Sequence, residues 1–234
     1  MRRTRYAAIL WILGALAFPA QLLASLRWPA PYSWSGHLIS DLGTTTCGII
    51  DAGSRAERYV CSPWHALANG ATIANGALLA AGALLLWNAW PRRTPGRWAS
   101  ALLGAGGLLV VGVGLVPWDA DPELHAAFAL SQAPAQWAGM ALVAASWRTG
   151  RTPGIPALTC AALAVSVAGF ALFVDAVGGG PSLALGLGLA ERIAFDTLTL
   201  WSAAVGCLLL RRHRGPEIPE PVPANARAAT NGGR

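Results

Sequence analysis

The 234-residue sequence contains no lysine, and only 12% of its residues are charged. A soluble domain of this size carries about twice that share of charged residues. Hydrophobic residues make up 54% of the chain and the mean hydropathy is +0.46. Apolar runs recur along the chain, each of about 20 residues and so long enough to cross a bilayer as a helix. These features exclude a soluble globular enzyme, a disordered regulator and a disulfide-knot peptide.

All 17 basic residues are arginine, and the net charge is +6. The arginines cluster between apolar runs, for example at residues 2–5, 92–97 and 211–214. This is the positive-inside pattern of a membrane protein, in which the basic loops stay in the cytoplasm. We therefore expect the lipid bilayer as partner and no nucleic acid.

The apolar runs predict six transmembrane helices, at residues 6–26, 63–90, 98–116, 122–147, 155–175 and 186–210. The expected fold is an all-α six-helix bundle, residues 1–210, in the cytoplasmic (inner) membrane with both termini cytoplasmic. Residues 211–234 predict a disordered cytoplasmic tail. A cleaved signal peptide is the alternative for the first 26 residues, but the run is long for one and no clean cleavage site follows it.

The first outer loop, residues 27–62, is long for a connection without helices, and such loops are usually functional or partly folded. It contains Cys47 and Cys61. Conditions outside the cytoplasmic membrane are oxidising, so we expect these two residues to form a disulfide. Cys160 and Cys207 lie in apolar helices and are interpreted as packing residues.

Polar side chains gather in the outer halves of the three helices expected to run inward. They are His65, Asn69 and Thr72; His125, Gln132 and Gln136; and Glu191, Arg192 and Asp196. The spacing places the first two sets each on one helix face. Arg192 and Asp196 are one turn apart and can pair. Three helix N-termini and Arg192 would favour a phosphate or carboxylate group at this end.

The first functional hypothesis is a protein that binds or handles an anionic lipid or amphiphile in a pocket facing the periplasm or exterior. No cofactor is expected for it. The outer loop would act as a lid over the pocket. The ligand-binding candidates are Asp41, His65, Asn69, His125, Gln132, Glu191, Arg192 and Asp196.

The alternative is a zinc-dependent membrane hydrolase acting on a lipid amide or ester. Its metal-ligand candidates are His37, His65, His125 and Asp41, because catalytic zinc is held by such a set. Its catalytic candidates are Asp41, His65, His125 and Glu191, with Glu191 or Asp119 as general base. A second alternative is a non-catalytic membrane subunit that contacts a partner through the small-residue faces of helices 98–116 and 155–175.

Several short segments carry a family resemblance. They are Tyr32-Ser33, Ile39-Ser40-Asp41-Leu42-Gly43, Ser62-Pro63, residues 114–117 with His125, and residues 188–192. Together they resemble the bacterial and archaeal membrane proteins of domain-of-unknown-function family 998 over about residues 8–210. The resemblance implies a six-helix membrane protein of unestablished activity. Residues 39–43 are also distantly similar to a segment of the Frag/DRAM-like lipid-remodelling membrane proteins, although Thr44-Thr45-Thr46 replaces the paired Pro expected after it.

Overall fold

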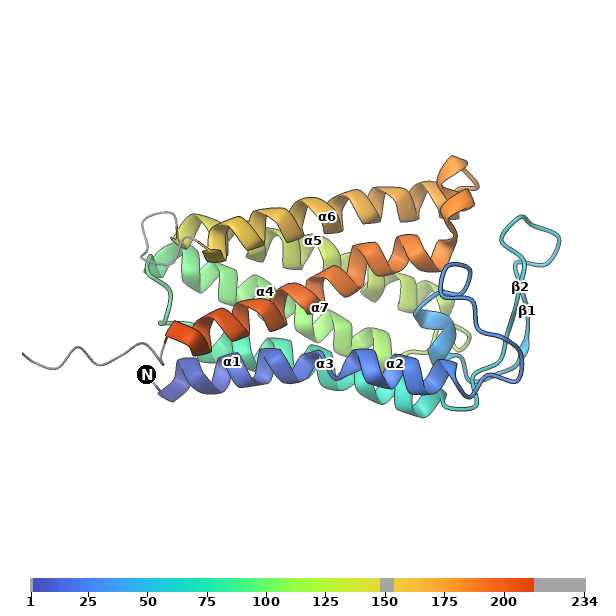
Figure 1. Ribbon diagram of the computed structural model, residues 1–234, viewed down its shortest axis with the longest axis horizontal. Coiled ribbons are helices and arrows are strands. Elements are labelled where there is room, and N and C mark those ends of the chain that lie inside the picture. Colours follow the sequence, from blue (N-terminus) through green and yellow to red (C-terminus); the bar gives the residue numbers. More distant parts are fainter. Residues whose placement is uncertain (1, 148–153, 213–234) are drawn as a thin grey trace, which may run out of the picture.

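The computed structural model describes residues 2–147 and 154–212, and its helices run along one common axis (Figure 1). The helices are α1 (Arg2–Gly14), α2 (Ala17–Ser25), α3 (His65–Leu85), α4 (Arg93–Leu115), α5 (Pro122–Trp147), α6 (Gly154–Val177) and α7 (Leu187–Arg212). Two short 3-10 helices, η1 (Ser40–Gly43) and η2 (Pro181–Leu185), and two strands, β1 (Gly48–Ile50) and β2 (Arg58–Val60), lie between them. Beyond Arg211 and Arg212, the predicted tail lies outside the described residues.

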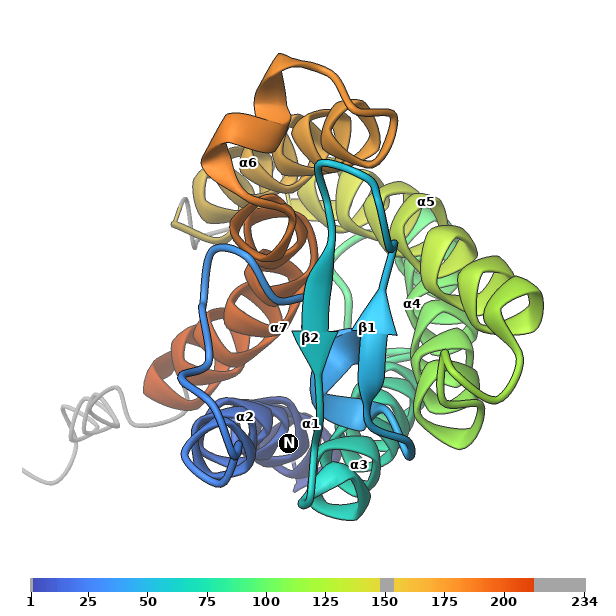
Figure 2. The same cartoon turned by 90° about the vertical axis from the view of Figure 1, so that its right-hand side faces the viewer.

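The helices form a closed ring when the molecule is viewed along its axis (Figure 2). From α3 to α7 each helix packs against the next one, and α1 packs against both α3 and α7, which closes the ring. The two ends of the ring differ. We call the end near residue 2 the terminal end, and the end that carries β1 and β2 the loop end (Figure 1).

Five stretches are long and apolar enough to cross a membrane: α1 together with α2, α3, α4, α6 and α7. The predicted class, a helical multi-pass membrane protein, is therefore confirmed. Helix α5 has the bounds that the sequence predicts for the fourth span. It is not among the five because Gln132 and Gln136 lower its hydropathy.

The first predicted span is not one continuous helix. It divides at Ala15 and Leu16, where backbone N–H groups donate to carbonyls three residues earlier instead of four. Pro19 explains the break, because it has no N–H for the carbonyl of Ala15 and its ring crowds that carbonyl. Phe18 donates to Ala15 instead. The expectation of an unbroken helix is corrected at this point.

The terminal half of the bundle holds the main hydrophobic core. Trp11 lies at its centre, 1% exposed, with its ring centroid 5.7 Å from that of Trp201 and 6.4 Å from that of Trp90. Its indole Nε1 donates to the carbonyl of Leu79 at 3.1 Å. Gly82 lies against the indole, where any side chain would collide with it. This half is closed by apolar packing.

Small residues on α4 and α6 also pack inside the bundle. Gly107 lies against the backbone of α3, and Gly169 lies against the backbone of α7. Gly107 and Gly169 are therefore buried inside the bundle and are not available for the partner interface proposed from the sequence. Cys160 and Cys207, expected as packing residues, are instead exposed on the outside of the bundle. Lipid-facing and core positions are both apolar, so hydropathy does not separate them.

The loop-end segment, residues 26–64, folds as a cover for that end (Figure 2). Strands β1 and β2 pair antiparallel, with Ile49 opposite Tyr59. The predicted disulfide between Cys47 and Cys61 is present. A second apolar cluster, comprising Ala24, Trp28, Leu42, Val60 and Ala68, attaches the segment to the bundle. The short strands are an addition to the predicted all-helical class.

Candidate functional site

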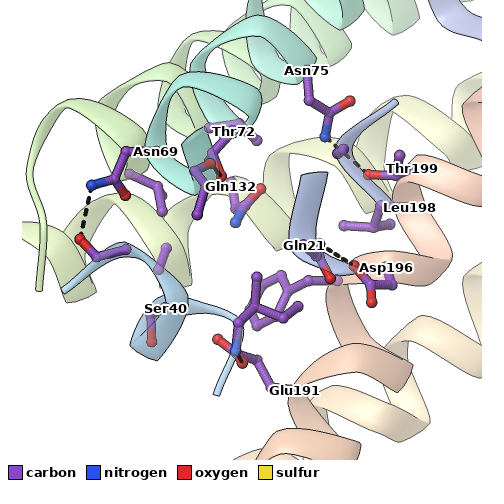
Figure 3. Close-up of a pocket in the computed structure, with 18 of the residues that line it drawn as sticks. Gln21, Ser40, Asn69, Thr72, Asn75, Gln132, Glu191, Asp196, Leu198 and Thr199 are labelled. Atoms are coloured by element: carbon purple, nitrogen blue, oxygen red, sulfur yellow. Dashed lines mark hydrogen bonds between the residues drawn. The ribbon is translucent and has the colours of Figure 1, made fainter. Parts of the chain in front are cut away.

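A cavity of about 100 Å³ lies in the loop-end half of the bundle (Figure 3). Residues of α2, α3, α4, α5, α7 and η1 line it. Its polar lining residues are Gln21, Ser40, Asn69, Thr72, Asn75, His125, Gln132, Gln136, Glu191, Asp196, Thr199 and Ser202. Polar side chains are costly inside an apolar bundle, so a group of them around a cavity marks a candidate functional site.

Helix α3 contributes a polar stripe to the cavity wall. Asn69 Nδ2 donates to the carbonyl of Gly43 at 2.8 Å, which joins the helix to η1. Asn75 Nδ2 donates to Thr199 Oγ1 at 3.0 Å, which joins α3 to α7. Of the three residues predicted to share this face, Asn69 and Thr72 line the cavity. His65 lies outside the cavity, and its Nδ1 is 3.0 Å from the carbonyl of Ser62.

Helix α5 contributes His125, Gln132 and Gln136, the face that the spacing predicts. His125 Nδ1 lies 2.6 Å from the carbonyl of Val116. Gln136 is 2% exposed and its Nε2 donates to Gln132 Oε1 at 3.2 Å. Pro134 lies between the two glutamines and removes one backbone donor from the helix.

Helix α7 contributes two carboxyl groups. Glu191 is 8% exposed and accepts a hydrogen bond from the backbone N–H of Ile39. Asp196 Oδ1 accepts from Gln21 Nε2 at 3.3 Å. The ion pair between Arg192 and Asp196 that their spacing allows does not form, since the ion pairs of the described residues all involve Arg58.

Arg192 points instead into the loop-end segment. Its Nη1 donates to the carbonyls of Trp34, His37 and Gly188 at 2.8–2.9 Å, and its Nη2 donates to the hydroxyl of Tyr32. Its guanidinium carbon lies 4.8 Å from the centroid of the Trp34 ring. Burial raises the pKa of Tyr32 above its ordinary value, although Arg192 opposes the shift. Arg192 is not among the residues that line the cavity, so it serves as a tie between α7 and the loop.

Asp41 is fully buried in η1 and bonded on both oxygens. Arg58 Nε donates to Oδ2 at 2.7 Å and Nη2 donates to Oδ1 at 2.9 Å, while the N–H of Leu38 also donates to Oδ2 at 2.8 Å. Burial opposes the charge on Arg58, but the hydrogen bonds and charges of Asp41 and Asp51 outweigh it and raise the pKa of Arg58. Asp41 therefore holds the turn of residues 38–41 to β2.

The four metal-ligand candidates have separate partners. His37 accepts the N–H of Ser33 at Nδ1 and lies 3.0 Å from the carbonyl of Tyr59 at Nε2. His65 and His125 face backbone carbonyls, and Asp41 faces Arg58. Within residues 2–147 and 154–212, no group of three or more His, Cys, Asp or Glu side chains is placed to hold a metal ion.

Asp119, the other candidate base, lies outside the cavity. Its Oδ2 accepts four hydrogen bonds of 2.9 Å, from the backbone N–H and the hydroxyl of both Thr45 and Thr46. Partial burial acts to raise its pKa, but these hydrogen bonds outweigh it and hold the pKa of Asp119 below its ordinary value. This carboxylate fastens the loop-end segment to the connection between α4 and α5.

Two segments that carry the family resemblance meet at the cavity. Ile39 and Glu191 are 152 positions apart in sequence, yet the N–H of Ile39 donates to the Glu191 carboxylate. A family model described as "Protein of unknown function (DUF998)" matches residues 12–208. The chain belongs to the DUF998 family. The comparisons found no matching curated protein and no matching solved structure. In this DUF998 protein, the matched residues include the whole cavity wall.

Sequence analysis missed several cavity residues, among them Gln21, Asn75 and Thr199. A signal for Gln21 was available, because it is the one strongly polar side chain in the first apolar run. Asn75 and Thr199 lie deeper along α3 and α7, and each satisfies the other. The tryptophan core lies beyond them, toward the terminal end.

Proposed function

We propose that this DUF998 protein binds a membrane amphiphile at its loop end and places the polar head group of that amphiphile in the cavity. The observation that carries the proposal is the cavity itself, because half of its lining residues are polar although the bundle around it is apolar. Each such side chain costs free energy in a membrane unless it has a partner or a ligand. A binding site accounts for their convergence from several helices.

The size of the cavity limits what it accepts. Sites for drug-sized ligands have volumes of roughly 300–1,000 Å³. A cavity of about 100 Å³ holds a small group only. An amphiphile satisfies this limit, because its head group enters the cavity and its chains remain among the exposed apolar side chains that face the bilayer.

The proposed arrangement has six crossings of the inner membrane, with the loop end outside and both termini in the cytoplasm. The arginines at the terminal end support this orientation, since basic residues stay cytoplasmic. Arg2, Arg3 and Arg5 lie in the first turns of α1, and Arg92, Arg93 and Arg97 lie at the start of α4. The disulfide at the loop end fits an oxidising compartment.

The loop-end segment serves as the cover of the site in this proposal. Ile39, Ser40 and Gly43 form part of the cavity wall. Gly43 lies directly against the side chain of Asn69, which any side chain at position 43 would have to displace. The proposal includes no metal ion, because the imidazoles already face backbone carbonyls.

The test is the lipid content of the purified protein. Gln132→Leu keeps the side-chain volume and removes a polar group from the cavity wall. We expect the lipid that co-purifies in mild detergent, measured by mass spectrometry per mole of protein, to fall about tenfold, the effect of losing one good hydrogen bond in a buried site.

The matched control is Asn88→Leu, a polar-to-leucine change at an exposed position of the terminal end. It should leave the lipid content unchanged. Thermal unfolding of both variants shows whether the bundle is intact. Equal lipid content in wild type, Gln132→Leu and the control would overturn the proposed function.

A further inference from the structure

The charged groups of the cavity wall are all of one sign. Glu191 and Asp196 line it, while none of the described arginines does. His125 also faces the cavity and bonds a backbone carbonyl at Nδ1. The nearest basic group along α7 is Arg192, and the loop carbonyls and the Tyr32 hydroxyl occupy both of its terminal nitrogens. The cavity therefore offers two carboxylates without a counter-ion bonded to either.

Both carboxyl groups have unused hydrogen-bonding capacity. Each has one donor in the described part of the chain, Ile39 for Glu191 and Gln21 for Asp196. A carboxylate accepts about four hydrogen bonds, whereas an ammonium group offers three donors and no acceptor. Figure 3 shows the two side chains approaching the cavity from successive turns of α7. An ammonium group matches them in charge and in donors.

Two neutral donors on the same wall also lack acceptors. Gln132 is 9% exposed, its Nε2 has no bonded acceptor among the described residues, and Figure 3 shows its amide end pointing into the cavity. The indole Nε1 of Trp118, another lining residue, is buried and likewise has no acceptor there. A hydroxyl or ester oxygen suits them, whereas a full anion would lie beside two carboxylates in a medium of low dielectric constant, where repulsion is strong.

We infer that the group bound in the cavity is a protonated amine carried by an amphiphile, with Glu191 and Asp196 as its counter-ions. This rests on the proposed function and replaces the anionic ligand that the sequence suggested with a cationic one. Arg192 is not among the residues that line the cavity, so it takes no part in binding the amine.

The experiment compares four single-chain probes on the purified full chain in uncharged detergent: dodecylamine, dodecanol, dodecyl phosphate and propylamine. Binding is measured by native mass spectrometry and by the shift in thermal midpoint. We expect dodecylamine to bind at least about tenfold more tightly than dodecanol, because charge-assisted hydrogen bonds are roughly twice as strong as neutral ones. A preference for dodecyl phosphate, or equal binding of dodecylamine and dodecanol, would overturn the inference.

Three variants connect the preference to the carboxylates. Glu191→Gln and Asp196→Asn keep an oxygen that accepts from Ile39 or Gln21, so the fold is retained while one negative charge is lost. Each should weaken dodecylamine binding about tenfold and leave dodecanol unchanged. Glu123→Gln, at an exposed position outside the cavity, is the control and should have no effect. Unchanged dodecylamine binding in both cavity variants would overturn the inference.

The two proposals fail separately. Suppose that Gln132→Leu loses the native lipid but Glu191→Gln and Asp196→Asn bind dodecylamine like wild type. The proposed binding site is then supported, and the inferred preference for amines is overturned. If propylamine binds as tightly as dodecylamine, the amine is taken from water, and the inference that an amphiphile carries it is overturned.

Discussion

The two halves of the bundle are built from the same helices and are stabilised in different ways. In the terminal half, Trp11, Trp90 and Trp201 fill the ring, and the indole of Trp11 finds its acceptor on α3. In the loop-end half, small and polar residues leave a cavity, and the loop-end segment covers it. Large side chains fill the interior of the terminal half, whereas hydrogen bonds between polar residues surround the cavity of the loop-end half.

The difference lies in what each half can accommodate. A densely packed core tolerates no added group, because interiors are packed like organic crystals. A space bounded by hydrogen bonds can accept a ligand without moving a helix. Mutations that test this difference should therefore change side-chain size in the terminal half and charge in the loop-end half.

The largest effect is expected in the terminal half. Trp11→Ala should destabilise the bundle by about 3–5 kcal/mol, the usual cost of truncating a buried aromatic residue. Thermal or denaturant unfolding in detergent measures it. Trp98→Ala, at a side chain that is 64% exposed, provides the matched control and should change stability little. Equal losses in the two variants would contradict the assignment of Trp11 as the centre of the core.

A somewhat smaller effect is expected at the cover of the loop end. Arg58→Met leaves the buried Asp41 carboxylate without its ion-pair partner, and such a loss costs about 3 kcal/mol. We expect it to appear as faster hydrogen exchange in residues 38–60, with the terminal half still protected. Asp41→Leu together with Arg58→Met should recover part of the loss. If exchange instead rises uniformly, the cover is not an independent unit.

The smallest effect is expected at Asp119. Because its pKa is held below the ordinary value, the folded chain binds fewer protons there than the unfolded chain does. Its stabilisation is therefore fully present above the ordinary pKa and is lost as the pH falls through the lowered one. It should amount to roughly a few tenths of a kcal/mol, since the group is only partly buried and solvent screens its charge. The difference in thermal midpoint between wild type and Asp119→Asn should be present near neutral pH and vanish in acid.

The helices and their polar faces could be predicted from the sequence because both follow from hydropathy and spacing. The break in the first helix could have been predicted too, since Pro19 stands within the run. The outward position of Cys160 could not, because a residue facing lipid and a residue facing the core look alike in composition. Strands β1 and β2 could not be predicted, because three residues each are too few to show an alternating pattern.

The sequence predicted the position of the candidate site correctly, but it did not predict that Arg192 lies outside the cavity wall. The spacing placed Asn69, Gln132 and Asp196 at one end of the bundle, and all three line the cavity. Three of the four partners of Arg192 could not be predicted, because the carbonyls of Trp34 and His37 and the hydroxyl of Tyr32 lie more than 150 positions earlier in the chain. The spacing of four residues predicted an ion pair between Arg192 and Asp196. Arg192 instead donates its hydrogen bonds to the loop.

The contact between the loop and α7 also determines when the site comes into existence during synthesis. Tyr32, His37 and Ile39 emerge from the ribosome long before Glu191 and Arg192, which complete their hydrogen bonds. Until the last helix has entered the membrane, the cover has no anchor on that side and the cavity has no carboxylates. A chain that stops before residue 187 thus contains α1 to α6 and still lacks both carboxylates of the cavity wall.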